Sequence, residues 1–174
     1  DSHPTWYWYL PHFLLMWGIL IFVSWLVKKM PLITGGGIPQ TRGVINGRVA
    51  YKHPFIEVIA KFVGGILALS TGLSLGREGP SVQIGSYVGC LVSKWGRVLA
   101  GERKQLLAAG AGAGLAAAFA APLASSLLVI ESIERFDAPK TAITTLLAGV
   151  VAGGVASWLF PINPYFQIDA IVPG

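Results

Sequence analysis

The sequence predicts an all-α integral membrane protein, and three observations lead to that fold class. Of the 174 residues, 53% are hydrophobic and 12% are charged, whereas a soluble domain carries about a quarter charged residues. The apolar runs are long and lack the strict alternation of a transmembrane barrel, which favours helices. The 22 glycines suit close helix packing in lipid. We therefore expect one transmembrane domain over residues 1–174.

The composition also argues against several functional classes. The net charge of +5 fits basic cytoplasmic loops, so we expect a membrane-lipid partner and no nucleic acid. The sequence contains no HExxH motif, and none of its three histidines belongs to a credible metal constellation. We expect neither an enzyme nor a cofactor. A single cysteine, Cys90, excludes an internal disulfide.

The chain begins with a predicted membrane span. The aromatic cluster at residues 6–9 is typical of a membrane–water interface. The stretch from Leu10 to Val27 is almost wholly apolar and can cross a bilayer, which takes about 20 helical residues. Lys28 and Lys29 follow, and because basic residues concentrate in cytoplasmic loops, we expect this end of the span in the cytoplasm.

Two glycine-rich turns predict re-entrant half-helices. In residues 31–40 (PLITGGGIPQ), Pro39 stands just inside a helix start, and the apolar stretch that follows is too short to span. A flexible cytoplasmic loop is the alternative for this segment. The second turn, Gly76–Pro80, leads into a helical segment at Ser81–Val92 that soon meets Lys94. Non-helical backbone within a membrane must be covered by protein or water, so we expect both turns inside the protein.

Two more apolar segments are long enough to span. Phe55–Leu75 contains Glu57 and Lys61, whose spacing and order favour a helical ion pair, and we expect this pair to be structural. Thr141–Phe160 is the last predicted span and runs from the cytoplasm outward.

The alanine-rich run from Gln105 to Ile130 carries no charge and predicts two packed helices. Gly110 and Gly114 form a small-xxx-small face, which lets two helix backbones approach closely. Pro122 interrupts the run near its centre, so a tight outer turn should join the two helices.

The distribution of basic residues supports this path through the membrane. Eleven of the 13 lysines and arginines fall in segments placed on the cytoplasmic side: Lys28, Lys29, Arg42, Arg48, Lys52, Lys94, Arg97, Arg103, Lys104, Arg135 and Lys140. Straightening either half-helix into a full span would put a basic cluster on the outside, against the usual bias.

The second glycine-rich turn is the strongest candidate for a functional site. It places Arg77 and Glu78 within a very apolar chain, and charges inside a bilayer are costly and usually functional. A turn of this kind that feeds a helix start presents unpaired N–H groups to an anion. The Glu78 carboxylate can occupy that site itself or leave it to a dissolved anion. The alternative is a purely structural glutamate paired with Arg77.

Three motifs together resemble the CLC family of chloride channels and proton-coupled chloride transporters. They are Gly35–Pro39 (GGGIP), Gly76–Pro80 (GREGP) followed by SVQIG, and the run Gly110–Leu123. The resemblance implies a homodimer and two inverted repeats, whose half-helices point their N-termini at an anion site within the membrane. The chain matches only the first repeat, and the second repeat is absent from it. We therefore expect either a longer protein or a truncated one.

The resemblance also assigns roles to residues. Glu78 matches the gating glutamate, which carries the proton in the transporters, and Arg77 is expected to orient its turn. The residues expected at the anion sites, mostly through backbone amides, are Gly36, Gly37, Ile38, Arg77, Glu78 and Gly79.

Two positions depart from the family pattern. Gly36 replaces a serine whose hydroxyl contacts the central anion, so the inner site should be wider or weaker and nitrate becomes possible. Fluoride is disfavoured because Pro80 is intact. Ser132 stands at the internal proton-glutamate position, and serine does not titrate near neutral pH. Glu131 or Glu134 is a candidate substitute.

These expectations combine into one functional hypothesis. The chain is expected to serve transport of chloride or similar monovalent anions, as a CLC H⁺/Cl⁻ exchanger gated by Glu78, in a bacterial inner membrane. Chloride is then a transported ligand. An uncoupled anion channel is the alternative suggested by Ser132, and a non-conducting structural half-fragment is the alternative from another class.

Overall fold

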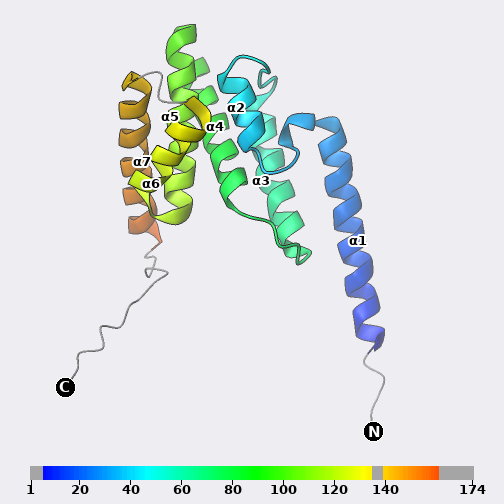
Figure 1. Ribbon diagram of the computed structural model, residues 1–174. Coiled ribbons are helices and arrows are strands. Elements are labelled where there is room, and N and C mark those ends of the chain that lie inside the picture. Colours follow the sequence, from blue (N-terminus) through cyan, green and yellow to red (C-terminus); the bar gives the residue numbers. More distant parts are fainter. Residues whose placement is uncertain (1–5, 135–138, 161–174) are drawn as a thin grey trace, which may run out of the picture.

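The structure is a computed structural model that describes residues 6–134 and 139–160 of the chain (Figure 1). Every regular element in this described part is helical. Seven α-helices follow one another: α1 (Trp6–Lys29), α2 (Ile38–Ile45), α3 (Pro54–Ser70), α4 (Glu78–Trp95), α5 (Ala100–Phe119), α6 (Pro122–Val129) and α7 (Pro139–Leu159). A 3₁₀ turn, η1 (Pro31–Ile33), precedes α2, and a π-helical turn, η2 (Ile130–Glu134), follows α6.

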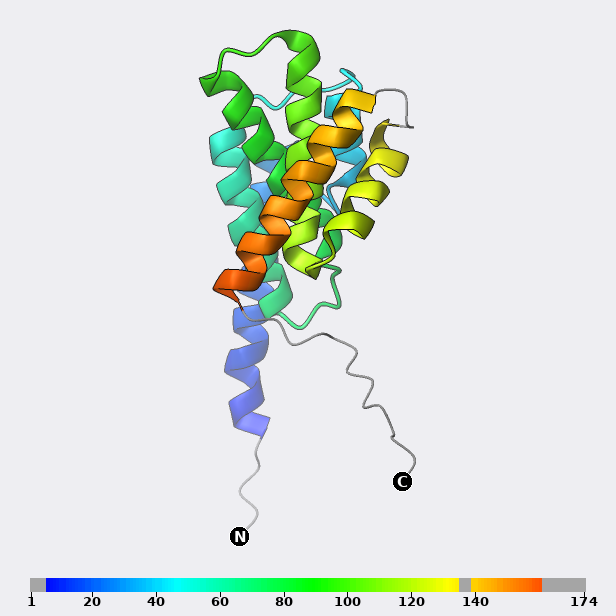
Figure 2. The same ribbon diagram turned by 90° about the vertical axis from the view of Figure 1, so that its left-hand side faces the viewer.

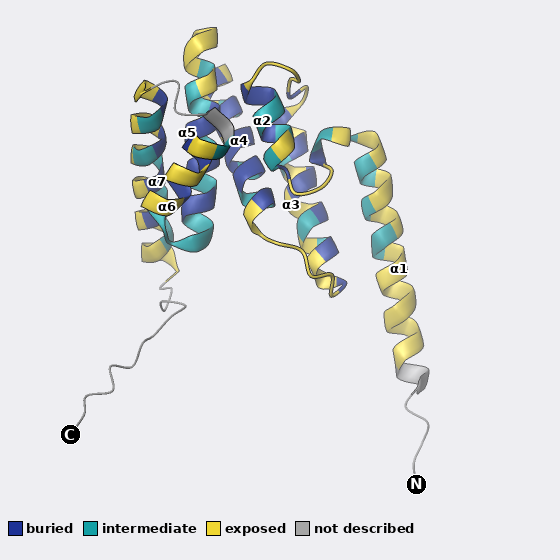
Figure 3. Cartoon of the chain, viewed as in Figure 1, coloured by how far each residue is buried: buried dark blue, intermediate teal, exposed yellow. Residues whose placement is uncertain are grey.

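Helix α5 is the centre of the bundle. It packs against α4, α6 and α7, while α3 lies on the other side of α4 (Figures 1 and 2). The buried side chains concentrate where α4 and α5 meet, with Tyr87 and Leu107 among the largest (Figure 3). Helix α1 stands at the edge against α3 and is mostly exposed along its length. A helix that is apolar all round and yet uncovered is typical of a membrane span.

Glycines bring α4 and α5 into backbone contact. A Cβ atom added at Gly85 would overlap the carbonyl oxygen of Gly110, and one added at Gly110 would overlap that of Gly85. Gly114 lies in the same way against the carbonyl oxygen of Ser81. The predicted small-xxx-small face is confirmed, and its partner is a second glycine pair on α4, Gly85 and Gly89. We call these contacts the α4–α5 seam.

The predicted break in the alanine-rich run is also confirmed. Helix α5 ends at Phe119, Ala120 adopts a left-handed conformation with φ 52°, and α6 begins at Pro122. Proline suits the first helical turn because the amide it lacks would have no acceptor there.

The predicted boundaries of α3 and α4 were wrong. Helix α3 stops at Ser70 and does not reach Leu75, because Gly72 turns the chain with φ +78°. Helix α4 extends beyond the predicted Ser81–Val92 at both ends. Its first turn includes Pro80, which breaks no helical hydrogen bond at that position.

Two of the predicted spans are long and apolar enough to cross a membrane among the described residues, namely α7 and the Tyr9–Lys29 part of α1. The predicted span at Phe55–Leu75 is not among them, because α3 ends at Ser70 and has 17 residues. The helix ends that carry basic residues lie at one end of the bundle, at the top of Figure 1: the last turns of α1 and α4 and the first turns of α5 and α7. Arg135, which was also assigned to this side, lies outside the described residues.

Candidate anion site

The two glycine-rich turns lie against each other in the fold. A Cβ atom added at Gly79, in the first turn of α4, would overlap the carbonyl oxygen of Gly36, just before α2. Gly37 caps α2 with φ +92°, and a Cβ atom there would come 3.0 Å from the carbonyl oxygen of Gly79 and closer still to the side chain of Gln83. Only glycine fits these contacts without displacement. We call this meeting point the α2–α4 crossing.

Each helix start at the crossing leaves backbone amides without a helical partner. The first helical bond of α2 runs from the Thr41 amide to the Gly37 carbonyl oxygen, at 2.9 Å. The corresponding bond of α4 runs from the Ser81 amide to the Arg77 carbonyl oxygen, at 3.2 Å. Amides that precede these bonds have no acceptor within their own helix, and they lie at the positive end of the helix dipole.

A buried lysine holds the first turn in place. Lys61 is only 6% exposed, and its ammonium group donates hydrogen bonds to the carbonyl oxygens of Ile33 at 2.8 Å and Gly35 at 2.7 Å. The predicted ion pair with Glu57 is therefore wrong. Glu57 Oε1 instead accepts a bond from the His53 amide at 3.3 Å, and its Oε2 has no hydrogen-bond partner. The turn carbonyls have no partner in a helix, which makes them strong acceptors for the ammonium group.

Gln83 lies directly beneath the crossing. Its side chain is fully buried, and Nε2 donates to the carbonyl oxygen of Leu32 at 2.6 Å and to the Tyr87 hydroxyl at 3.2 Å. Its Oε1 has no hydrogen-bond partner and is the atom nearest to the position of a Cβ at Gly37. Gln83 was not among the predicted site residues. A long polar side chain within a buried glycine-rich helix was the available signal.

A second polar cluster ties α2 to α4 farther along. The Tyr51 hydroxyl donates to Ser86 Oγ at 3.4 Å, lies 3.4 Å from Thr41 Oγ1, and its ring packs against Tyr87 with centroids 4.2 Å apart. Burial raises the pKa of the Tyr51 hydroxyl, which lies in the loop before α3. The group therefore stays neutral and keeps its proton for hydrogen bonding.

The predicted gate lies at the mouth of an apolar pocket. Glu78, the first residue of α4, is exposed and lines a pocket of ≈ 260 Å³ together with Ile38, Leu115, Phe119 and Ser125. Arg77 points its guanidinium over the Phe119 ring, 5.3 Å from the ring centroid. The pocket thus joins residues from both glycine-rich turns to the turn between α5 and α6.

A sequence model of the family described as voltage gated chloride channel matches residues 19–173. The chain belongs to the voltage gated chloride channel family. This confirms the resemblance seen in the GGGIP and GREGP motifs.

Individual members of the family agree in sequence and in structure. The H(+)/Cl(-) exchange transporter ClcA of Vibrio cholerae is 38% identical over 140 residues, covering 78% of this chain and 30% of its own length. ClcA of Citrobacter koseri is 36% identical over 158 residues, covering 84% of this chain and 33% of its own length. A crystal structure of a slow cyanobacterial Cl⁻/H⁺ antiporter superposes with a TM-score of 0.83 and 30% identity, over 93% of this chain and 39% of that one.

These matches define what the chain shares with the family. The all-helical CLC-type fold is confirmed, and the matched proteins are named as transporters and not as enzymes. The chain spans about a third of the length of the curated relatives it matches.

Ser132, at the predicted internal proton position, is separate from Glu78, the predicted gate. Ser132 lies in η2 and is half-buried, while its neighbour Glu131 is exposed. Ala124 lines the Glu78 pocket, and Ser132 follows it by two helical turns, about 12 Å along the axis. The Glu134 side chain lies outside what the structure describes. Within the described residues, no three His, Cys, Asp or Glu side chains are grouped as a metal site.

Proposed function

We propose that this chain provides the α2–α4 half of an anion pathway in a transporter of chloride or a similar monovalent anion, with Glu78 as its gate. The observation that carries this proposal is the backbone contact of the two helix starts, between Gly36 and Gly79. The names of the relatives, H(+)/Cl(-) exchange transporters, support chloride and protons as the transported ions.

The proposed anion ligands are backbone amides. These amides precede the first helical hydrogen bond of each helix, so their N–H groups can donate hydrogen bonds to an anion. They belong to Ile38 and Gln40 of α2 and to Glu78 and Gly79 of α4. Partial charges of this kind bind an ion firmly enough for it to shed water and weakly enough for it to leave.

The full positive charges near the crossing have other contacts. The Lys61 ammonium is bound to two carbonyl oxygens, and the Arg77 guanidinium lies over Phe119. In the proposed mechanism, both residues therefore shape the turns without holding the ion. Arg77 orients its turn, as the family resemblance implies.

Glu78 acts by competition in this mechanism. As a carboxylate it is an anion at the start of α4 and takes the place of the transported ion. Protonation removes the charge, and the side chain then turns away from the helix start into the pocket that it lines, where Leu115 and Phe119 offer an apolar wall. The gate thereby links anion flow to a proton.

Two modes of coupling remain distinct candidates. Exchange of chloride for protons is favoured by the names of the relatives. Uncoupled anion flow is favoured by Ser132, whose hydroxyl does not titrate near neutral pH, at the position where the family pattern has a proton-carrying glutamate. The homodimer and the bacterial inner membrane belong to the same proposal.

The test uses the full-length gene product in liposomes, with chloride and proton electrodes in one vessel. We expect chloride efflux that depends on pH, and we expect Glu78→Gln to retain flux and lose the pH dependence. Glu102→Gln, which neutralises an exposed carboxylate in the first turn of α5, is the matched control and should behave as the unaltered protein.

Each outcome decides between the candidates. Proton uptake driven by chloride efflux identifies an exchanger, and chloride flux without proton movement identifies uncoupled flow. If Glu78→Gln keeps the original pH dependence, the gate assignment is wrong. Crosslinked dimers that pass neither chloride nor nitrate would support the non-conducting structural alternative.

A further inference from the structure

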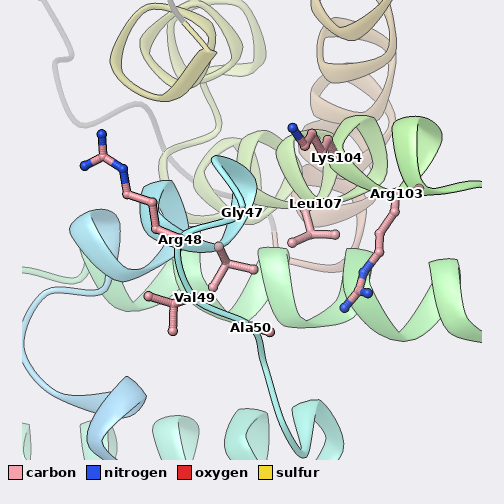
Figure 4. Close-up of a pocket in the computed structure, with 9 residues that line it drawn as sticks. Gly47, Arg48, Val49, Ala50, Arg103, Lys104 and Leu107 are labelled. Carbon is pink, nitrogen blue, oxygen red and sulfur yellow. The ribbon is translucent and has the colours of Figure 1, made fainter.

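A second cavity lies away from the anion site, among the basic helix ends. Its volume is ≈ 370 Å³, and it is formed by the loop that follows α2 and by the first two turns of α5 (Figure 4). It shares no lining residue with the Glu78 pocket. The proposed transport mechanism does not use it.

Three cationic side chains line this cavity. Arg48 comes from the loop after α2, and Arg103 and Lys104 come from the start of α5. No acidic residue is among the lining residues. In Figure 4, Arg48 and Lys104 extend toward the same side of the cavity, and Arg103 extends toward the other. Arg103 donates a hydrogen bond to Cys90 Sγ at 3.4 Å, whereas Arg48 and Lys104 are like charges on one side, and a bound anion would relieve their repulsion.

The rest of the lining is apolar. Val44 and Leu107 are buried members of the hydrophobic core, whereas Val49 is 45% exposed. A small inorganic anion would leave the exposed Val49 side chain without an apolar partner. A ligand that carries a charged group next to an apolar group would contact both the cationic and the apolar parts of the cavity lining.

We propose that this cavity binds a phosphate group. The planar guanidinium of Arg48 can offer paired donors to phosphate oxygens, and Lys104 adds a point charge on the same side. The group can come from an anionic phospholipid headgroup at the cytoplasmic face or from a soluble phosphate. The apolar walls and the position beside the membrane-spanning helices favour the lipid.

The experiment measures lipid binding to the full-length gene product by native mass spectrometry. Phosphatidylglycerol is titrated against phosphatidylcholine, which has no net charge, and we expect preferential binding of phosphatidylglycerol. The double variant Arg48→Gln/Lys104→Gln should lower its affinity at least about tenfold, given the contribution of each basic residue near a charged headgroup. Both residues are exposed, so folding should be unaffected.

The matched control removes the same charge elsewhere on this face. Lys28→Gln/Lys29→Gln neutralises two exposed lysines at the end of α1 and should keep the preference for phosphatidylglycerol. Equal loss in both double variants, or no preference in the unaltered protein, overturns the proposal. If inorganic phosphate at constant ionic strength displaces the lipid and also binds alone, the site takes soluble phosphate. Chloride flux of the same variants is measured in parallel. Because lipid binding and flux are separate readouts, a failure of the gate assignment would not change the lipid-binding result.

Discussion

Glycines bring backbones into contact in two regions of the molecule, and the two contacts differ in what they leave available. In the α4–α5 seam, Gly85 meets Gly110 within two long helices. In the α2–α4 crossing, Gly79 meets Gly36 at two helix starts. Amides inside a helix are already bonded, whereas amides in its first turn are not. Close approach therefore gives packing at the seam, whereas at the crossing it gathers amides without a helical acceptor, which we propose as anion ligands.

The comparison predicts its largest effect at the seam. Gly110→Leu would place a side chain against the carbonyl oxygen of Gly85, which belongs to a helix and cannot move aside. We expect a loss of about 3 kcal/mol of folding free energy, the upper part of the range for overpacking. The measurements are the yield of monodisperse protein in detergent and its thermal unfolding. Gly154→Leu on α7 is the control, because a Cβ atom there meets nothing within 4 Å.

A smaller change at the crossing should affect transport more than folding. Gly79→Ala would force the start of α4 away from the Gly36 carbonyl oxygen and disturb the amides proposed to bind the anion. We expect folded protein whose chloride flux in liposomes falls at least about tenfold, because about 1.4 kcal/mol of lost ion stabilisation suffices for that factor. Flux equal to that of the unaltered protein would contradict the assignment of the crossing as the anion site.

Replacing Lys61, which supports the crossing, should have an intermediate effect on stability. Lys61→Met keeps much of the volume but leaves the buried carbonyl oxygen of Ile33 and that of Gly35 without their donor. We expect about 2 kcal/mol of lost stability from the unsatisfied acceptors, measured by thermal unfolding. The anion affinity should fall as well, since the first turn loses its anchor. Glu57→Gln is the control, because Glu57 does not pair with Lys61.

The smallest structural effect is expected at Gly36 itself. A Cβ atom there meets nothing within 4 Å, so Gly36→Ser fits without displacement and restores the hydroxyl of the family pattern. We expect unchanged unfolding and a shift in the ratio of nitrate to chloride flux toward chloride. An unaltered ratio would show that position 36 does not determine the anion preference of this protein.

Much of this architecture was readable from local sequence. Pro39 and Pro122 predicted helix starts, and Gly110 and Gly114 predicted a packing face. The basic clusters predicted which helix ends lie together. These features act over one or two helical turns, so neighbouring residues determine them.

The interactions that could not be predicted from the sequence join residues far apart in the chain. Lys61 was expected to pair within its own helix, yet it reaches carbonyl oxygens 28 and 26 positions earlier in the chain. Gln83 was overlooked because its acceptor, the carbonyl oxygen of Leu32, lies 51 positions away. Neither partner is marked by residue type, since every residue carries a carbonyl group.

By itself, the sequence determined that this is a helical membrane protein with two glycine-rich helix starts, because composition and helix signals are local properties. Only the tertiary structure decided that those two starts touch, that Lys61 and Gln83 support them, and that Arg48 shares a cavity with Arg103 and Lys104. The physical reason is that such contacts depend on how α2, α4 and α5 pack, and many sequence positions determine that packing together.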